Sequence, residues 1–233
     1  MNNNKYFCLR NLKIDYYKNF QIPKYIENLL IKNKIKSILD YGCGLGQLTT
    51  SLHYKKYKVT GMDRSNESLV ELKKKKINFL KIKNLKTQKK KFKDKFDLII
   101  LNHVLEHQKK GEILSFLKDL KFMLKKNGLI FIAVPNAQAL TTAYWRYEDF
   151  THETIFTSGS LYYVLKASGF QHIKFIDIYA TQNLNIITGT IRLFALKLIE
   201  IIYPIILKIT GNGFHATSKN IFTYEIKCIA KKN

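Results

Sequence analysis

The chain has 233 residues, of which 46% are hydrophobic, so it can bury one substantial core of the size of a single α/β domain. Its formal charge of +23 comes from lysines spread along the chain, which we interpret as solvated surface, so that a nucleic-acid partner is disfavoured. Three scattered cysteines exclude a disulfide framework, and a polar start unlike a signal peptide predicts a cytoplasmic protein.

Apolar runs of strand length alternate with helical patterns from residue 37 to about residue 180. This alternation is typical of repeated β-α-β units and predicts an α/β fold with a doubly wound, mostly parallel sheet and helices on both faces. A final pair of strands is separated by an insertion. The seven expected strands are 37–41, 57–62, 77–82, 96–101, 129–134, 173–179 and 222–230.

Helix ends are indicated by capping residues. A helix between the fourth and fifth strands is expected to end at Asn127 and Gly128, which have the character of a C-terminal cap. A later helix is expected to begin with Thr157 or Ser158 as its N-cap and to stop at Gly169. The first of these helices would cover the sheet.

The segment 186–210 is unusually apolar, but charges interrupt it before any run reaches the roughly 20 residues of a membrane span. It therefore predicts an amphipathic helical insertion, kinked at Pro204, and no transmembrane helix. Packing on its own domain, a homodimer interface and peripheral contact with an anionic membrane on the inner face are all open as covers for the apolar side. The interrupting charges are Arg192, Lys197, Glu200 and Lys208.

We expect a single domain over 1–233. A helical N-terminal cap (1–35) precedes the cofactor-binding core (36–180). The apolar insertion (181–216) then separates this core from the final strand (217–233).

The first strand runs into a glycine loop, Asp40-Tyr41-Gly42-Cys43-Gly44-Leu45-Gly46, and a helical pattern follows. Glycines let the backbone turn sharply and approach a ligand closely, because they have no Cβ atom. The second strand ends in Asp63, about 20 residues after Asp40, the separation expected for a carboxylate that binds ribose hydroxyls. Together the two features predict a nucleoside pocket.

These residues resemble the cofactor motifs of class I S-adenosylmethionine (SAM)-dependent methyltransferases, whose loop is commonly Asp-x-Gly-x-Gly-x-Gly. The likeness continues through 96–107 and 124–136 and covers most of 22–170. It implies a Rossmann-like, seven-stranded sheet with an antiparallel last strand, and SAM as cofactor. By this likeness the glycine loop lies against the methionine part of SAM, Asp63 holds the ribose, and two asparagines border the cofactor. The implied cofactor residues are Asp40, Gly42, Gly44, Gly46, Asp63, Asn84 and Asn102. Many relatives carry an acid where Asn84 stands.

The segment 144–157 follows the fifth strand, where acceptor-binding segments of this fold commonly lie. Its motif, Asp-Phe-Thr-His-Glu-x-x-Phe-Thr, resembles that of methyltransferases of bacterial surface-polysaccharide and lipopolysaccharide pathways. This likeness implies O-methylation of a nucleotide sugar or a lipid-linked glycan. The alternative acceptors are a quinone-type precursor and RNA. A non-catalytic scaffold is the least favoured function. Nucleobase acceptors are disfavoured because His103, Val104 and Leu105 replace the Pro-Pro-Tyr of adenine methyltransferases.

A hydroxyl acceptor needs a base, and imidazole titrates near physiological pH. The candidate bases are His103, His107 and His152, with Asp149 expected to orient His152; alternatively His152 only hydrogen-bonds its own loop. On a helix, His103, Glu106 and His107 would share one face, so that His152 could complete a cation site. No residue is assigned as a metal ligand, since His103 replaces the first acid of the Glu-x-x-Glu-His pattern found in some small-RNA and quinone methyltransferases.

Overall fold

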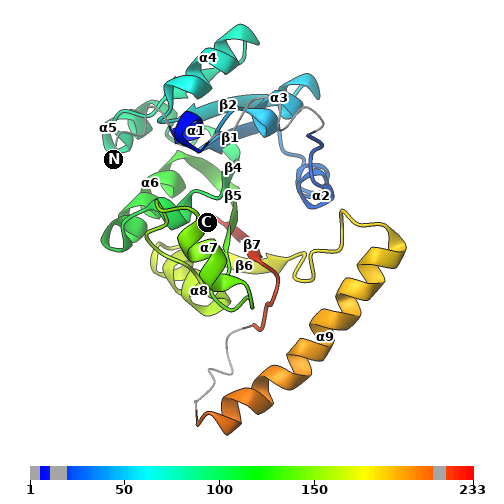
Figure 1. Ribbon diagram of the computed structural model, residues 1–233. Helices are drawn as coiled ribbons and strands as arrows, with labels where there is room; N and C mark the ends of the chain where they lie inside the picture. The colour runs from blue at the N-terminus through cyan, green and yellow to red at the C-terminus, as the bar shows by residue number, and fades with distance from the viewer. Residues whose placement is uncertain (1–5, 11–19, 212–218) are drawn as a thin grey trace.

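The computed structural model describes residues 6–10, 20–211 and 219–233 (Figure 1). Parts of the expected N-terminal cap, of the insertion and of the final segment therefore lie outside the described residues. The strands are β1 (Ser37–Tyr41), β2 (Lys58–Asp63), β3 (Phe79–Lys81), β4 (Phe96–Asn102), β5 (Leu124–Pro135), β6 (Gln171–Ile176) and β7 (Glu225–Lys231).

The strands form one seven-stranded sheet in the order β3-β2-β1-β4-β5-β7-β6. β7 is antiparallel to β5 and to β6, and the remaining neighbours are parallel. This confirms the expected mostly parallel sheet with an antiparallel last strand. The chain moves outward from β1 to β3 and then crosses back to β4 on the other side of β1. Ligands of open α/β sheets bind at such a switch point, beyond the carboxyl ends of the strands.

Helices join and flank the strands. They are α1 (Tyr6–Leu9), α2 (Lys24–Lys32), α3 (Gln47–Tyr54), α4 (Asn66–Lys74), α5 (Leu85–Gln88), α6 (Ile113–Met123), α7 (Thr142–Glu148), α8 (Ser158–Ala167) and α9 (Ile186–Ile209). Short 3-10 turns lie at η3 (Lys89–Phe92), η4 (Leu105–His107) and η5 (Lys110–Glu112).

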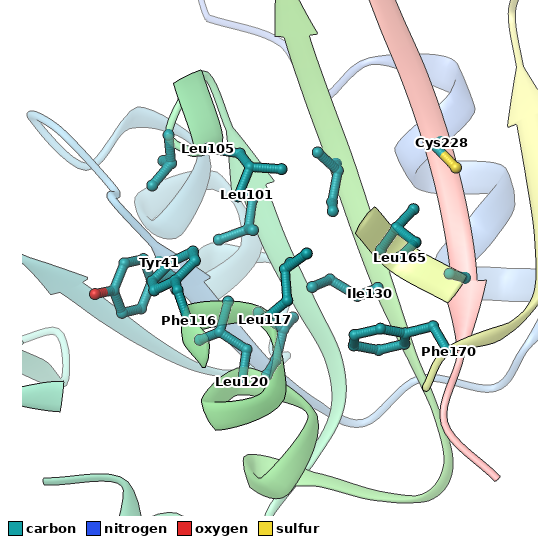
Figure 2. Close-up of a cluster of buried hydrophobic side chains, with 14 of the residues drawn as sticks. Tyr41, Leu101, Leu105, Phe116, Leu117, Leu120, Ile130, Leu165, Phe170 and Cys228 are labelled. Atoms are coloured by element: carbon teal, nitrogen blue, oxygen red, sulfur yellow. The ribbon is translucent and has the colours of Figure 1, made fainter. Parts of the chain in front are cut away.

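Two apolar clusters cover opposite faces of the sheet. Successive residues of β4 belong to different clusters, Ile99 to one and Ile100 to the other, as the alternation of side chains along a strand requires. Figure 2 shows the first cluster, in which Leu117 of α6 and Leu165 of α8 pack with β4 and β5. α2 and α3 cover the second face. Both faces are apolar, which explains the almost uninterrupted hydrophobic runs of the central strands.

The expected end of the helix before β5 is wrong. α6 ends at Met123, and Leu124 is already extended and pairs with Phe96 of β4. Asn127, with a φ of 63°, and Gly128 belong to an irregular stretch of β5, where the register with β4 shifts. The side chain of Leu124 is fully buried, so its packing draws the chain into the sheet before the cap-like residues are reached.

The other helix signals are confirmed. Thr157 is the N-cap of α8, and it exchanges hydrogen bonds with Ser160 in a capping box. Gly169 has a φ of 82° just beyond the end of α8.

The insertion folds as one helix, α9, which continues through Pro204. In Figure 1 this gold-to-orange helix extends away from the sheet. Along the chain as described, no helix combines the length and the apolar character that crossing a bilayer would require.

Candidate functional site

The glycine loop lies at the switch point, immediately after β1. Gly42, Gly44 and Gly46 all have positive φ angles, of 74°, 55° and 81°. A Cβ atom on Gly42 would lie 2.3 Å from Cγ2 of Val104, and one on Gly46 would lie 2.5 Å from Cδ2 of Leu72. Both the backbone conformation and the packing therefore require glycine at these two positions.

Asp63, at the end of β2, closes this loop from the neighbouring strand. Its Oδ2 accepts a hydrogen bond from the backbone N–H of Gly44 at 2.9 Å, and its Oδ1 accepts one from the N–H of Ser65 at 2.8 Å. Burial raises the pKa of Asp63, while these backbone N–H groups oppose the shift. The structure thus brings the predicted ribose carboxylate and the predicted glycine loop together.

Asp40 is buried beneath the loop, with only 3% of its surface exposed. Its carboxylate accepts a 2.5 Å hydrogen bond from the hydroxyl of Thr49 in α3. Burial raises the pKa of Asp40 to about 6, against the opposing effect of the Thr49 hydroxyl. Asp40 therefore ties α3 to the end of β1, and its direct contact with a cofactor stays a prediction.

The two asparagines expected beside the cofactor are exposed. Asn102 is the last residue of β4, next to β1 in the sheet. Asn84 follows β3 and precedes the first residue of α5. Both follow the carboxyl ends of parallel strands, which share one edge of the sheet with the glycine loop.

A second cluster lies between η4 and the loop after α7. Glu106, His107 and His152 each place one carboxylate oxygen or ring nitrogen within 4.8 Å of the others. Glu106 is fully buried, and neither carboxylate oxygen has a hydrogen-bond partner in the described part of the chain. A buried carboxylate without hydrogen bonds is costly, so it requires a positive group close by, and Nδ1 of His103 lies 3.3 Å from its Oε1.

His152 is held by the backbone. Its Nδ1 donates to the carbonyl of Trp145 at 2.7 Å, so the neutral ring presents Nε2 as an acceptor, 4.0 Å from Oε1 of Glu106. Burial lowers the pKa of His152, and the nearby His107 lowers it further. The ring is therefore neutral at physiological pH and able to accept a proton.

The expectation that Asp149 orients His152 is wrong. The carboxylate of Asp149 accepts hydrogen bonds from Tyr6, from Arg10 at 2.9 Å and from the backbone and hydroxyl of Thr151. The same hydroxyl lies 2.8 Å from Nδ1 of His107. Asp149 therefore supports His107 through the hydroxyl of Thr151. The ring of His152 is oriented by the backbone carbonyl of Trp145, and not by Asp149 as predicted.

His103 does not share a helical face with Glu106 and His107, because its φ is 54° and the helical turn begins only at Leu105. Its Nε2 lies 3.0 Å from Glu225, and its Nδ1 lies 3.3 Å from Glu106, close enough for an ion pair but without hydrogen-bond alignment. Burial alone would lower the pKa of His103, but the two carboxylates outweigh it and raise the pKa to about 10. A ring that stays protonated has no free lone pair to accept a proton, so we no longer expect His103 to act as the base.

Sequence reasoning missed Tyr6, Arg10 and Glu225. Arg10 and Asp149 are separated by 139 residues, and His103 and Glu225 by 122. No local pattern connects such partners. The one usable signal was Glu225, the single acid of the last strand.

The arrangement offers two sites with complementary functions. The glycine loop with Asp63 can hold a nucleoside-containing cofactor, and the cluster of Glu106, His107 and His152 can remove a proton. The same cluster could hold a divalent cation, because each imidazole is anchored through Nδ1 and keeps Nε2 free.

Comparison with known proteins gives matches in sequence and in structure. A family model described as a methyltransferase domain matches residues 15–174. The ubiquinone biosynthesis O-methyltransferase of Pelagibacter ubique (strain HTCC1062) is 36% identical over 126 residues, which are 48% of this chain and 52% of that protein. The (S)-coclaurine N-methyltransferase of Thalictrum flavum subsp. glaucum is 28% identical over 97% of this chain and 65% of its own. The chain thus spans between half and two thirds of these relatives.

Solved structures show the same fold. A SAM-dependent methyltransferase from Archaeoglobus fulgidus superposes with a TM-score of 0.62 at 19% identity, covering 93% of this chain and 98% of its own. Phosphoethanolamine N-methyltransferase 2 from Haemonchus contortus, in complex with SAM, gives a TM-score of 0.60 at 15% identity, over 100% of this chain and 60% of its own.

Proposed function

This chain belongs to the methyltransferase-domain family, and we propose that it transfers the methyl group of SAM to a hydroxyl oxygen of its acceptor. One observation carries the proposal: a glycine loop closed by the carboxylate of Asp63 lies at the switch point of a sheet whose neighbouring loops hold a neutral histidine.

SAM, when bound, supplies a methyl group activated on a sulfonium centre. The residues present fit such a ligand. The glycine loop allows close approach of the backbone, and the oxygens of Asp63 retain lone pairs for ribose hydroxyls beside the N–H groups of Gly44 and Ser65. Asn102 and Asn84 border the same edge of the sheet. Asp40 supports the loop from below through Thr49.

The protein must align the acceptor and remove its proton. Nε2 of His152 would accept the proton of the acceptor hydroxyl, whose oxygen would receive the methyl group that SAM supplies. The ring then carries a positive charge. Glu106, buried 4.0 Å away without a hydrogen-bond partner among the described residues, stabilises that charge.

The acceptor is best sought among hydroxylated rings. The segment after β5 combines exposed aromatic side chains, Tyr144 and Tyr147, with the charged tip of Arg146, which supports a sugar in a nucleotide sugar or a lipid-linked glycan. A quinone-type phenol is the second candidate, favoured by the similarity to the ubiquinone biosynthesis O-methyltransferase.

The test is transfer of a tritiated methyl group from SAM to a panel of nucleotide sugars, lipid-linked glycans, quinone precursors, amines and RNA. We expect label on a sugar. Label on a quinone precursor instead would support the second candidate, and label only on amines or RNA would refute hydroxyl transfer.

The base is tested separately by substitution. We expect His152→Gln to lower kcat by roughly 10²- to 10⁴-fold, the range of general-base catalysis, with SAM affinity unchanged. His172→Asn, at an exposed histidine of β6, is the control and should keep full turnover. If His152→Gln turned over as fast as the wild type, His152 would not be the base.

The cation alternative has its own readout. Proton removal by His152 predicts that turnover survives exhaustive treatment with EDTA. Loss of turnover that is restored by Mn²⁺ or Mg²⁺ would instead make Glu106, His107 and His152 ligands and overturn the assignment of His152 as the base.

A further inference from the structure

The surface of α9 differs from that of every other long helix described. Not one of its residues is buried, whereas α2, α6 and α8 each bury three or more. Its large apolar side chains are exposed instead: Ile187 by 73%, Phe194 by 73%, Ile201 by 66% and Ile209 by 79%. An exposed apolar surface of this extent marks a site of interaction.

The exposed apolar residues share one side of the helix. Projected at 100° per residue, those from Ile187 to Ile209 fall within an arc of roughly 140° that contains no charged side chain. At 1.5 Å per residue the helix is about 36 Å long. The apolar side is therefore a long, continuous strip, which we call the α9 strip.

The charged residues of α9 border this strip. Lys197 and Lys208 lie just beyond one edge of it. Arg192 lies just beyond the other edge, where its guanidinium donates to the carbonyl of Ala180 at 2.9 Å. Glu200 projects from the opposite side, where its carboxylate accepts a hydrogen bond from Tyr179 at 3.2 Å. Long basic side chains beside an apolar strip can keep their methylene groups in an apolar layer while their charged ends reach lipid phosphates.

We propose that the α9 strip inserts into the interfacial layer of an anionic lipid bilayer, with the helix lying parallel to the membrane surface. The charges favour this occupant over a second copy of the chain. Each copy has a net charge of +23, so pairing two strips would bring like charges together, whereas an anionic membrane neutralises them.

Aromatic contacts connect α9 to the acceptor side of the protein. The ring of Tyr203, in α9, packs against Phe222 with the ring centroids 4.9 Å apart. Two residues further on, Tyr224 packs against Trp145 of α7 at 5.3 Å. A bilayer bound along α9 would therefore lie near the segment that carries His152, although membrane binding itself does not depend on the identity of the acceptor.

The test is flotation of the purified full chain with vesicles of phosphatidylcholine alone or mixed with phosphatidylglycerol. We expect binding to the mixed vesicles, and weaker binding at about 1 M salt, where the Debye length falls to about 3 Å. Phe194→Glu combined with Ile201→Glu should weaken binding by about 100-fold, because two apolar side chains no longer enter the membrane. Replacing Lys197 or Lys208 by Gln should weaken it by about 5-fold each.

The matched control is Ile31→Glu combined with Val70→Glu, which makes the same chemical change at exposed positions of α2 and α4. This variant should bind vesicles as the wild type does. SAM binding, measured by calorimetry, checks that all variants are folded.

Three results would overturn the proposal: equal vesicle binding by the α9 and control variants, equal binding to neutral and anionic vesicles, or a lipid-free dimer that only the α9 variant dissociates.

Discussion

Replacing Asp63 by Asn tests the cofactor site with a change of a few atoms. The carboxylate accepts hydrogen bonds from the backbone N–H groups of Gly44 and Ser65, and its lone pairs are the proposed acceptors for ribose hydroxyls. An amide has one oxygen and one NH₂ group, so in either orientation the NH₂ meets one of these N–H donors. The variant therefore loses a charged acceptor and leaves a backbone donor without a partner.

A hydrogen bond to a charged group contributes about 1.5–3 kcal/mol. At 1.4 kcal/mol for each factor of ten, we expect Asp63→Asn to weaken SAM binding by roughly 10- to 150-fold in isothermal titration calorimetry. The displaced loop should also lower the stability of the ligand-free protein by about 1–3 kcal/mol.

Asp97 provides the control. Its carboxylate also accepts hydrogen bonds from two backbone N–H groups, those of Ser37 and Lys36, but at the amino end of β4, away from the glycine loop. Asp97→Asn should lower stability while SAM affinity stays at the wild-type value. Wild-type SAM affinity in Asp63→Asn would refute the proposed site, because the carboxylate could then not be a ligand contact.

Three further predictions concern the stability of the fold. Gly42→Ala places a methyl group 2.3 Å from Val104 Cγ2, so we expect a loss of about 1–3 kcal/mol in urea unfolding, partly recovered when Val104→Ala is added; no recovery would mean that backbone strain alone is responsible. Burial would raise the pKa of Asp97, but hydrogen bonds including that of Lys125 lower it to about 2. The contribution of Asp97 to stability is therefore complete above about pH 4 and is lost as the pH falls toward 2. Asp97→Asn should flatten this part of the stability profile, and an unchanged profile would contradict the pairing with Lys125. Lys227→Met removes a buried ammonium that lies 2.9 Å and 3.0 Å from two carboxylates, so unfolding in urea should require about 3–5 kcal/mol less; a smaller loss would mean that water reaches the pair.

Local patterns accounted for most of the architecture. The central strands were predictable because a parallel sheet covered on both faces needs uninterrupted apolar runs, and β1 was located to the residue. The pairing of the glycine loop with Asp63 followed from the order of the strands: β1 and β2 are neighbours, so the residues at their carboxyl ends must meet.

Failures occurred where packing competed with a local signal. Asn127 and Gly128 have the character of a helix cap, but burial of Leu124 in the sheet ended α6 earlier. His103, Glu106 and His107 have helical spacing, yet a positive φ at His103 places its ring between two carboxylates. Helical spacing places residues on one face only if the segment folds as a helix.

The sequence by itself determined the order of the strands and helices, the glycine loop and the carboxylate that closes it, because these depend on residues close together in the chain or on adjacent strands. Only the tertiary structure decided which histidine can accept a proton. Glu106 and Glu225 keep His103 protonated. Burial and the nearby His107 lower the pKa of His152 and keep it neutral, while the carbonyl of Trp145 orients its ring. A pKa depends on charge and solvent within a few ångströms, and residues brought there from distant parts of the chain leave no periodic signal in the sequence.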